Sequence, residues 1–276
     1  MTSPPETRYA RNGTVHLAYQ VLGEGPVNLV GIASGPASHV DFMWTEPSAA
    51  RWLRRLASFS RLVLYDNRGA GLSDPVPGGA APTMDEQVDD LGVILDQTGC
   101  ERAVLAGNLA GCAPALVYAA AHPERVESLI LMAGYARLRQ DADYPYGVKR
   151  AEPDQIAAAV LSTWGSGADL FLTNPTMAAD ENFRRWYAQI QRMAASPATA
   201  SAMARQWFDI DVRAILPAIK VPALVIARAG NATFPAHHSR YLADHIADAK
   251  YAEFPAPTCT CSSVTPIRSS ISSRNS

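Results

Sequence analysis

Residues 107–111 of this chain, Gly-Asn-Leu-Ala-Gly, constrain its fold more than any other segment, and we call them the elbow. An apolar run at 103–106 precedes them and a helix-like segment at 112–121 follows. A sharp strand-to-helix turn needs glycine at both ends, because a side chain there would collide with the neighbouring strand and helix. In Gly-x-Ser-x-Gly, the same turn lifts a nucleophilic serine above a sheet. Here the centre is Leu109, which can neither attack a carbonyl nor give up a proton.

Strand-like and helix-like patterns alternate on both sides of the elbow. Short apolar runs predict strands at 15–22, 27–33, 61–65, 104–106, 129–132, 221–227 and 251–254. Apolar residues at helical spacing predict helices at 47–59, 112–121 and 236–246. Thr83 and Glu86 have the spacing of a capping box that starts a further helix. This alternation predicts an α/β fold, with a mainly parallel sheet and helices on both faces.

The alternation stops between residues 136 and 214. This stretch has helical patterns at 155–164, 181–193 and 199–208, and it has no clear strand. We therefore expect residues 136–214 to form a helical lid, inserted into a core made of residues 1–135 and 215–255.

Composition excludes several classes of protein. A chain of 276 residues with a net charge of −2 has room for one substantial core, and it has no basic field to attract nucleic acid or an anionic membrane. Residues 1–13 are polar, and no apolar stretch reaches the roughly 20 residues that span a bilayer. We therefore expect a cytoplasmic protein.

The four cysteines do not form a convincing disulfide or zinc framework. Cys100 and Cys112 are expected to be buried free thiols. Cys259 and Cys261 are not followed by a second Cys or His pair, so a zinc site is not predicted. We expect no metal ion and no other cofactor.

Four further segments carry a resemblance to a known family. They are Arg-Leu-Ala-Ser-Phe-Ser-Arg at 55–61, Asp-Asn-Arg-Gly-Ala-Gly-Leu-Ser-Asp-Pro at 66–75, His-Pro-Glu-Arg-Val at 122–126 and Arg-Tyr-Leu-Ala-Asp-His-Ile at 240–246. Their order and spacing make residues 8–255 resemble the α/β-hydrolase superfamily. The nearer resemblance is to bacterial α/β-hydrolase-like domains that precede an adenylate or guanylate cyclase domain. Arg68 and Asp74 are expected to lock a turn. Gly69 and Gly71 are expected to serve its backbone geometry.

The resemblance implies a Ser–Asp–His catalytic triad, and all three of its positions differ in this chain. Leu109 occupies the place of the serine. Asn231 occupies the place of the acid, where an amide adds no negative charge to stabilise an imidazolium. No histidine follows the strand at 251–254, where the family's histidine lies. His237 and His238 instead begin a predicted helix and are expected to be solvated.

The resemblance also implies an oxyanion hole beside the elbow. The Ala110 N–H is available as one donor. The loop that should supply the second donor, residues 34–37, carries Pro36 after Gly35, and proline has no N–H. The oxyanion hole is therefore expected to be impaired.

A ligand site is still expected at the elbow. Gly107 and Gly111 keep their role as scaffold, and His39 lies in the nearby loop as a candidate ligand contact. We expect a mostly apolar pocket under the lid, bordered by Leu109, Pro36 and His39.

Residues 256–276 differ abruptly from what precedes them. Ser, Thr, Cys, Pro and Arg dominate, and there is no amphipathic helix, although the family closes its sheet with one there. One interpretation is a native irregular tail. The other is a shift of reading frame near residue 256, because the shifted frame can encode a His-containing segment followed by Gly-Asp, as in the family. The last helix of the fold is then missing, and the strand at 251–254 lies at or near the sheet edge.

Three functions fit these observations. The first is a non-catalytic domain with a degenerate triad, which binds a small apolar ligand or regulates a partner, such as the cyclase domain of an intact relative. The second is an active esterase-like hydrolase of small apolar esters that uses an unrecognised nucleophile: Ser34, Ser38 or Cys112. The third is a destabilised remnant without function.

Overall fold

Eight strands form one sheet in the described part of the chain, which comprises residues 4–148, 152–231 and 233–255 of a computed structural model. Their order across the sheet is β1 (Arg8–Asn12), β2 (Val15–Leu22), β4 (Ser60–Tyr65), β3 (Val27–Ile32), β5 (Ala103–Asn108), β6 (Val126–Met132), β7 (Ala223–Arg228) and β8 (Ala249–Phe254). The β1–β2 and β2–β4 pairs are antiparallel, and every pair from β4 to β8 is parallel. The predicted mainly parallel sheet is confirmed.

The sequence prediction missed β1 and placed β8 correctly. β1 is a short, mostly exposed strand in which only Ala10 is buried, so it has little of the apolar pattern that reveals a strand. β8 lies at the edge of the sheet. Near this edge Leu224 and Phe254 are 37% and 40% exposed. The predicted tail, frame shift and missing last helix concern residues 256–276, which lie outside the described residues.

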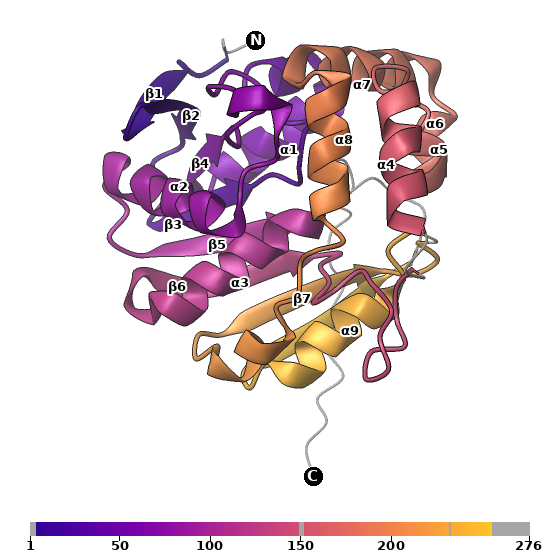
Figure 1. The fold of residues 1–276 in the computed structure, drawn as a ribbon. Helices are drawn as coiled ribbons and strands as arrows, with labels where there is room; N and C mark the ends of the chain where they lie inside the picture. Colours follow the sequence, from indigo (N-terminus) through magenta and orange to yellow (C-terminus); the bar gives the residue numbers. More distant parts are fainter. Residues whose placement is uncertain (1–3, 149–151, 232, 256–276) are drawn as a thin grey trace.

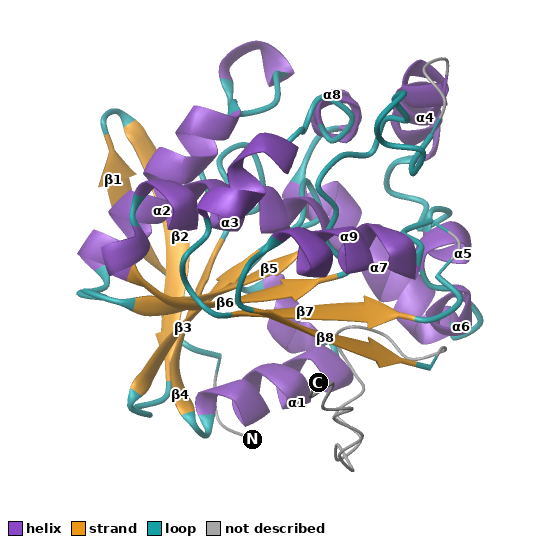
Figure 2. Cartoon of the chain, turned by 90° about the horizontal axis from the view of Figure 1, so that it is seen from below, coloured by secondary structure: helices purple, strands orange, loops and turns teal. Residues whose placement is uncertain are grey.

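Helices cover both faces of the sheet, as Figure 2 shows. They are α1 (Pro47–Ala57) on one face, and α2 (Met84–Gln97), α3 (Cys112–Ala121) and α9 (Ala236–His245) on the other. The capping box predicted for α2 is present, because Glu86 N donates to Thr83 Oγ1 at 3.2 Å and Thr83 N donates to Glu86 Oε2 at 2.8 Å. The helix predicted at 47–59 ends earlier, at Ala57, and Phe59 beyond its end is 56% exposed.

Five helices stand between β6 and β7 in the described residues, above one end of the sheet (Figure 1). They are α4 (Glu152–Thr163), α5 (Leu170–Thr173), α6 (Pro175–Ala178), α7 (Glu181–Ala194) and α8 (Pro197–Gln206). α4, α7 and α8 correspond to the three predicted helices, whereas the single turns of α5 and α6 are too short to show a periodic pattern.

The two ends of this helical segment are tied together. Val212 N donates to Ala136 O at 2.9 Å, so the chain leaves the segment beside the point where it started. Ion pairs reinforce this neck: Arg137–Asp211 (2.7 Å), Arg213–Asp143 (2.7 Å) and Arg139–Asp209 (2.8 Å). No helix of the described part of the chain is long and apolar enough to cross a membrane.

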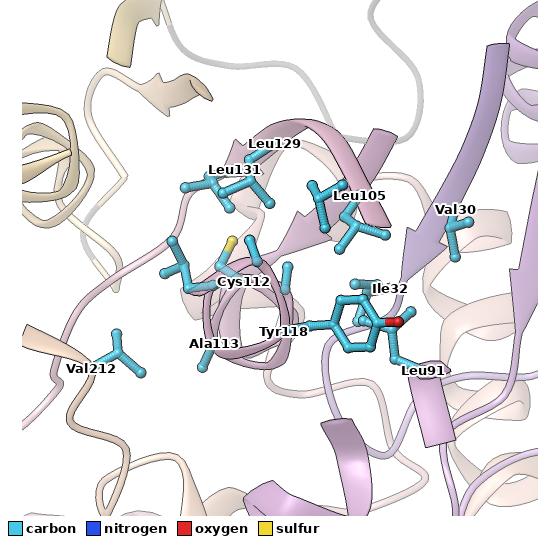
Figure 3. Close-up of a cluster of buried hydrophobic side chains, with 14 of the residues drawn as sticks. Val30, Ile32, Leu91, Leu105, Cys112, Ala113, Tyr118, Leu129, Leu131 and Val212 are labelled. Carbon is cyan, nitrogen blue, oxygen red and sulfur yellow. The ribbon is translucent and has the colours of Figure 1, made fainter. Parts of the chain in front are cut away.

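The main core lies between the sheet and the helices α2 and α3 that cover one of its faces (Figure 3). Leu105 of β5, Leu129 of β6 and Leu91 of α2 are all 0% exposed. Cys112 packs among them and is a buried free thiol, as is Cys100. The prediction for these two cysteines is confirmed, whereas Cys259 and Cys261 lie outside the described residues.

A group of aromatic rings fastens α9 to the start of the helical segment. His238 is 2% exposed, and its Nδ1 lies 3.0 Å from the hydroxyl of the fully buried Tyr144. Tyr144 also packs edge-on against Tyr241, and the Arg213 guanidinium lies over its ring at 5.6 Å. The expectation that His238 is solvated is therefore wrong, because the turn of α9 that carries it faces the buried Tyr144 and not the solvent.

Burial, together with the smaller effect of the neighbouring His237, lowers the pKa of His238 to about 4. The folded protein thus holds a neutral imidazole that is hydrogen-bonded to the Tyr144 hydroxyl. In the unfolded chain a histidine has a pKa near 6.5. This difference in pKa contributes its full share to the free energy of unfolding above pH 6.5. The contribution is lost as the pH falls from 6.5 to 4, because only the unfolded chain takes up the proton in that range.

We predict that His238→Gln makes the free energy of unfolding less dependent on pH, since a glutamine amide can donate to or accept from the Tyr144 hydroxyl but does not titrate. Between pH 7 and pH 4.5 the wild-type free energy of unfolding should fall by up to about 3 kcal/mol more than that of the variant. Urea unfolding at the two pH values measures this difference, and His122→Gln, at an exposed histidine, is the matched control. Equal slopes for wild type and His238→Gln would contradict the prediction.

Candidate functional site

The elbow has the geometry that its two glycines predict. A Cβ on Gly107 would lie 2.6 Å from Gly111 O and 2.7 Å from Cys112 Cα. A Cβ on Gly111 would lie 2.6 Å from Ile32 O of the neighbouring strand. These distances leave no space for a side chain, so the glycines bring β3, β5 and α3 into close contact at this point.

Leu109 occupies the apex of the elbow in a backbone conformation that leucine rarely adopts. Its φ is +50°, in the left-handed region, whereas most residues other than glycine avoid that region. The side chain is half-buried and packs against the main core. The turn that would expose a nucleophile is therefore kept, with an apolar side chain in the nucleophile's place.

A buried carboxylate holds the loop that faces the elbow. Asp66 is 0% exposed and accepts hydrogen bonds from Ser38 Oγ (2.6 Å), Val40 N (3.0 Å) and Leu72 N (3.0 Å). Burial raises the pKa of Asp66, and these hydrogen bonds oppose the rise. The hydroxyl of Ser38 is thus committed to Asp66, and this excludes Ser38 as a free nucleophile in this structure.

The turn at 66–75 has the structural role that the sequence predicts. Arg68 Nη2 donates to Asp90 Oδ1 at 2.6 Å and fixes the turn to α2. The Asp74 carboxylate accepts from His16 N of β2 at 2.8 Å. Gly69 and Gly71 have φ values of +82° and +58°, which glycine adopts without strain.

His39 also has a structural role. It is 7% exposed, and its Nδ1 accepts from Phe42 N at 3.2 Å, which leaves the ring in the loop and not in an open site. Phe42 stacks on Trp186 of α7 with a centroid distance of 6.0 Å, and Trp186 Nε1 donates to Thr45 Oγ1 at 3.0 Å. Residues 39–45 therefore contact α7 and support its position.

A small cavity lies beside the elbow, under the end of α8. Its volume is about 20 Å³, enough for one water-sized group. Its walls are Ala33, Gly35, Asn67, Pro82, Gln87, Ala110, Gly111, Met203, Gln206, Trp207 and Ile210. Of the predicted site residues, Gly35, Ala110 and Gly111 line this cavity, whereas Leu109, Pro36 and His39 do not.

Trp207 explains why the space is so small. A Cβ on Gly35 would lie 2.6 Å from Trp207 Cζ2, so the indole packs directly on the backbone of the loop that faces the elbow. The helical spacing of apolar residues in the sequence does not predict that Gln206 and Trp207 lie beside the elbow. Their position at the end of the third predicted helix of the 136–214 segment is the one signal that the sequence offered.

Cys112, the third nucleophile considered from sequence, is a buried core residue. It is 0% exposed, and burial raises the pKa of its thiol to about 12, so the reactive thiolate does not form near neutral pH. Its Sγ packs on Gly134, where a Cβ would lie 2.7 Å away. Ser34 is half-buried in the loop after β3, and its hydroxyl has no hydrogen-bond partner among the described residues. Of the three candidates, it is the one that the structure leaves accessible.

Asn231 forms a turn and not a charged partner for a histidine. Its Oδ1 accepts from Thr233 N (3.1 Å) and Phe234 N (3.0 Å), just before α9. The position expected for the family's histidine falls in 256–276, outside the described residues. Within the residues described, no three His, Cys, Asp or Glu side chains come together as a metal-binding group.

The left-handed conformation of Leu109 leads to a stability prediction. At an ordinary helical position Gly is less stable than Ala by roughly 0.5–1 kcal/mol. At the elbow we expect the reverse: Leu109→Gly should be more stable than Leu109→Ala by about 1 kcal/mol, because Gly avoids the left-handed strain of a residue with a Cβ. Denaturant unfolding of both variants measures the difference, and Ala158→Gly on the exposed face of α4 is the control that should destabilise. If Ala proves the more stable residue at 109, the strain is absent.

Comparison with known proteins agrees with this geometry. A family model described as alpha/beta hydrolase fold matches residues 36–257. A curated relative named "Putative carbamate hydrolase RutD", from Azorhizobium caulinodans, is 29% identical over 260 residues, which are 94% of this chain and 93% of the relative. The strigolactone esterase D14 of Arabidopsis thaliana is 28% identical over 192 residues, 67% of this chain and 70% of the relative. The solved esterase EaEST from Exiguobacterium antarcticum matches the fold with a TM-score of 0.76 at 21% identity, over 90% of this chain and 91% of that one. This chain belongs to the α/β-hydrolase family.

Proposed function

We propose that this chain is a non-catalytic member of the α/β-hydrolase family, which binds a small, mainly apolar molecule at the elbow. The observation that carries the proposal is Leu109, at the apex of a turn whose geometry is otherwise retained. A serine mechanism needs a hydroxyl and a base there, and leucine supplies neither. Asn231, which is engaged in a turn, supports the same conclusion.

Retention of the scaffold supports binding. The elbow, the loop after β3 and the end of α8 still enclose a small space, and Trp207 packs on Gly35 at its wall. A cavity of about 20 Å³ holds only a few atoms, so a larger ligand has to displace α8 and Trp207. In this proposal residues 136–214 act as a lid that opens for the ligand.

The biological role that we propose for binding is regulation. A domain that binds without converting its ligand can report the ligand's presence to a partner. The resemblance to domains that precede adenylate or guanylate cyclases suggests a cyclase domain of an intact relative as that partner. Ligand binding would then change the lid position and, through it, the partner's activity.

An active hydrolase is the second candidate. It is favoured by the names of the relatives, a carbamate hydrolase and an esterase, which are 29% and 28% identical to this chain. Such an enzyme would have to use a nucleophile other than Leu109. Ser34 is the remaining candidate, since Ser38 is bonded to Asp66 and Cys112 is buried in the core.

Turnover of 4-nitrophenyl acetate and 4-nitrophenyl butyrate distinguishes the non-catalytic protein from the active hydrolase. We expect the wild-type chain to hydrolyse neither ester faster than its Ser34→Ala variant, and a fluorophosphonate to label neither protein. Leu109→Ser should also remain unlabelled, because an unactivated serine is a weak nucleophile near neutral pH. Saturable wild-type turnover that Ser34→Ala abolishes would establish the hydrolase instead.

The binding part of the proposal has its own prediction. We expect the wild-type chain to bind 2-heptanone, a small uncharged apolar probe, saturably in ligand-observed NMR. Leu109→Arg should abolish this binding, since it brings a charged side chain to the apex of the elbow. Leu161→Arg, at a residue of α4 that is 51% exposed, is the control and should bind normally. An unchanged affinity in Leu109→Arg would place the ligand away from the elbow.

A further inference from the structure

A second hollow is formed entirely by the helical segment between β6 and β7. Trp164, which follows α4, and residues 192–197, which link α7 to α8, line it. In Figure 1 these elements stand together, with α4 and α8 beside each other below α7. The hollow is open to solvent and has a volume of about 500 Å³, within the range of small-molecule sites. It shares no lining residue with the cavity beside the elbow.

Hydrogen bonds hold the walls of this hollow in place. Trp164 Nε1 donates to Ala195 O at 2.9 Å, which fixes the indole against the link between α7 and α8. Gln191 of α7 is 1% exposed, and its Oε1 accepts from Gly165 N at 3.1 Å and from Gly167 N at 3.0 Å. The loop after Trp164 is thereby bonded to α7. A ligand that enters such a site pays little for ordering the protein around it.

Arg192 is the one charged side chain among the residues that line the hollow. One of its N–H groups donates to Gly165 O, and the guanidinium keeps further N–H groups for a ligand. No carboxylate of the described residues forms an ion pair with it. The hollow therefore carries one positive charge without a partner among those residues.

The two helix ends that meet here do not reverse this charge preference. α7 ends at Ala194 and α8 begins at Pro197, so the negative end of one helix dipole adjoins the positive end of the other. The carbonyls of Ala194 and Ala195 already accept from Gly71 N at 2.8 Å and from the Trp164 indole. The full charge of the guanidinium therefore favours an anionic ligand group.

The other walls favour an aromatic ring beside that anionic group. Trp164 is half-buried, and Met193 is 46% exposed, although it is a large apolar side chain. Indole rings, thioether sulfurs and guanidinium groups all make favourable contacts with aromatic rings. A ring that covers Met193 also removes its apolar surface from water. Since a single guanidinium is present, an anion of one negative charge suits the hollow better than a doubly charged phosphate.

We propose that this hollow is a binding site for an aromatic monocarboxylate. The carboxylate accepts hydrogen bonds from the Arg192 guanidinium, and the ring lies against Trp164 and Met193. Arginine suits this role because its planar N–H groups can donate in pairs to a carboxylate. The site is separate from the one proposed at the elbow, and neither needs the other.

Two ligands of nearly the same shape test the proposal on the unmodified protein. 2-Naphthoate and 2-naphthamide differ in the charge of the group that should face Arg192. We expect the wild-type chain to bind 2-naphthoate about fivefold more tightly at about 20 mM salt, as measured by ligand-observed NMR. The preference should shrink at about 500 mM salt, because salt screens an exposed charge pair. Equal affinities at low salt would contradict the proposal.

Substitutions of Arg192 assign the charge preference to the hollow. Arg192→Gln should weaken 2-naphthoate binding about fivefold and leave 2-naphthamide binding unchanged, whereas Arg192→Lys should retain part of the preference. Arg185→Gln is the matched control, since Arg185 is an exposed residue of the same helix that pairs with Glu181 and does not line the hollow. It should change neither affinity, and circular dichroism confirms that each variant is folded.

A substitution at Met193 tests the position of the ring. Met193→Glu places a carboxylate beside Arg192 and removes an apolar wall, so 2-naphthoate binding should weaken at least about tenfold. Leu161→Glu, at a residue of α4 that is 51% exposed and does not line the hollow, is the control and should bind normally.

Three outcomes would overturn the proposal. 2-Naphthoate does not bind saturably, or Arg192→Gln keeps the full preference for the acid, or Met193→Glu binds 2-naphthoate as the wild type does. In the last two cases the acid is bound elsewhere on the protein. None of these outcomes bears on the site at the elbow, which is tested separately with 2-heptanone and Leu109→Arg.

Discussion

The buried Asp66 carboxylate is the interaction on which the arrangement around the elbow depends. It bonds to the loop after β3 through Ser38 and Val40, and to its own turn through Leu72. Gly71 gives it room, since a Cβ there would lie 2.2 Å from Asp66 Oδ2. A buried carboxylate is stable only when its hydrogen bonds are satisfied, so these loops have little freedom to move independently. The arrangement of the loops around the elbow therefore follows from the hydrogen bonds of this one residue.

The same framework explains how the fold persists with leucine at the apex of the elbow. The close contact of β3, β5 and α3 depends on Gly107 and Gly111, and neither contact involves the side chain at 109. Leu109 adds apolar packing that offsets part of its backbone strain. The architecture of the elbow is thus independent of the side chain at its apex, since its close contacts do not depend on residue 109.

The sequence predicted the parallel sheet, the elbow, the capping box of α2 and the helices α4, α7 and α8, because each has a local pattern. It did not predict β1, whose exposed residues lack that pattern, nor the burial of His238, which depends on Tyr144, 94 positions earlier in the chain. At the site, the glycines were predictable from the backbone geometry that they allow. The convergence of Asn67, Gln87 and Gln206 was not, since each is an ordinary polar residue within its own element and only the packing of α8 brings them together.

The neck of the helical segment has a consequence for how this protein can diversify. Residues 136 and 212 are joined by a backbone hydrogen bond, and three ion pairs fasten the same place. A segment whose two ends already meet can be shortened, lengthened or exchanged without a change in the strands on either side, because the entropy of closing the loop varies only slowly with its length. We therefore expect that the helices between residues 136 and 212 can be exchanged at this neck while β6 and β7 remain paired.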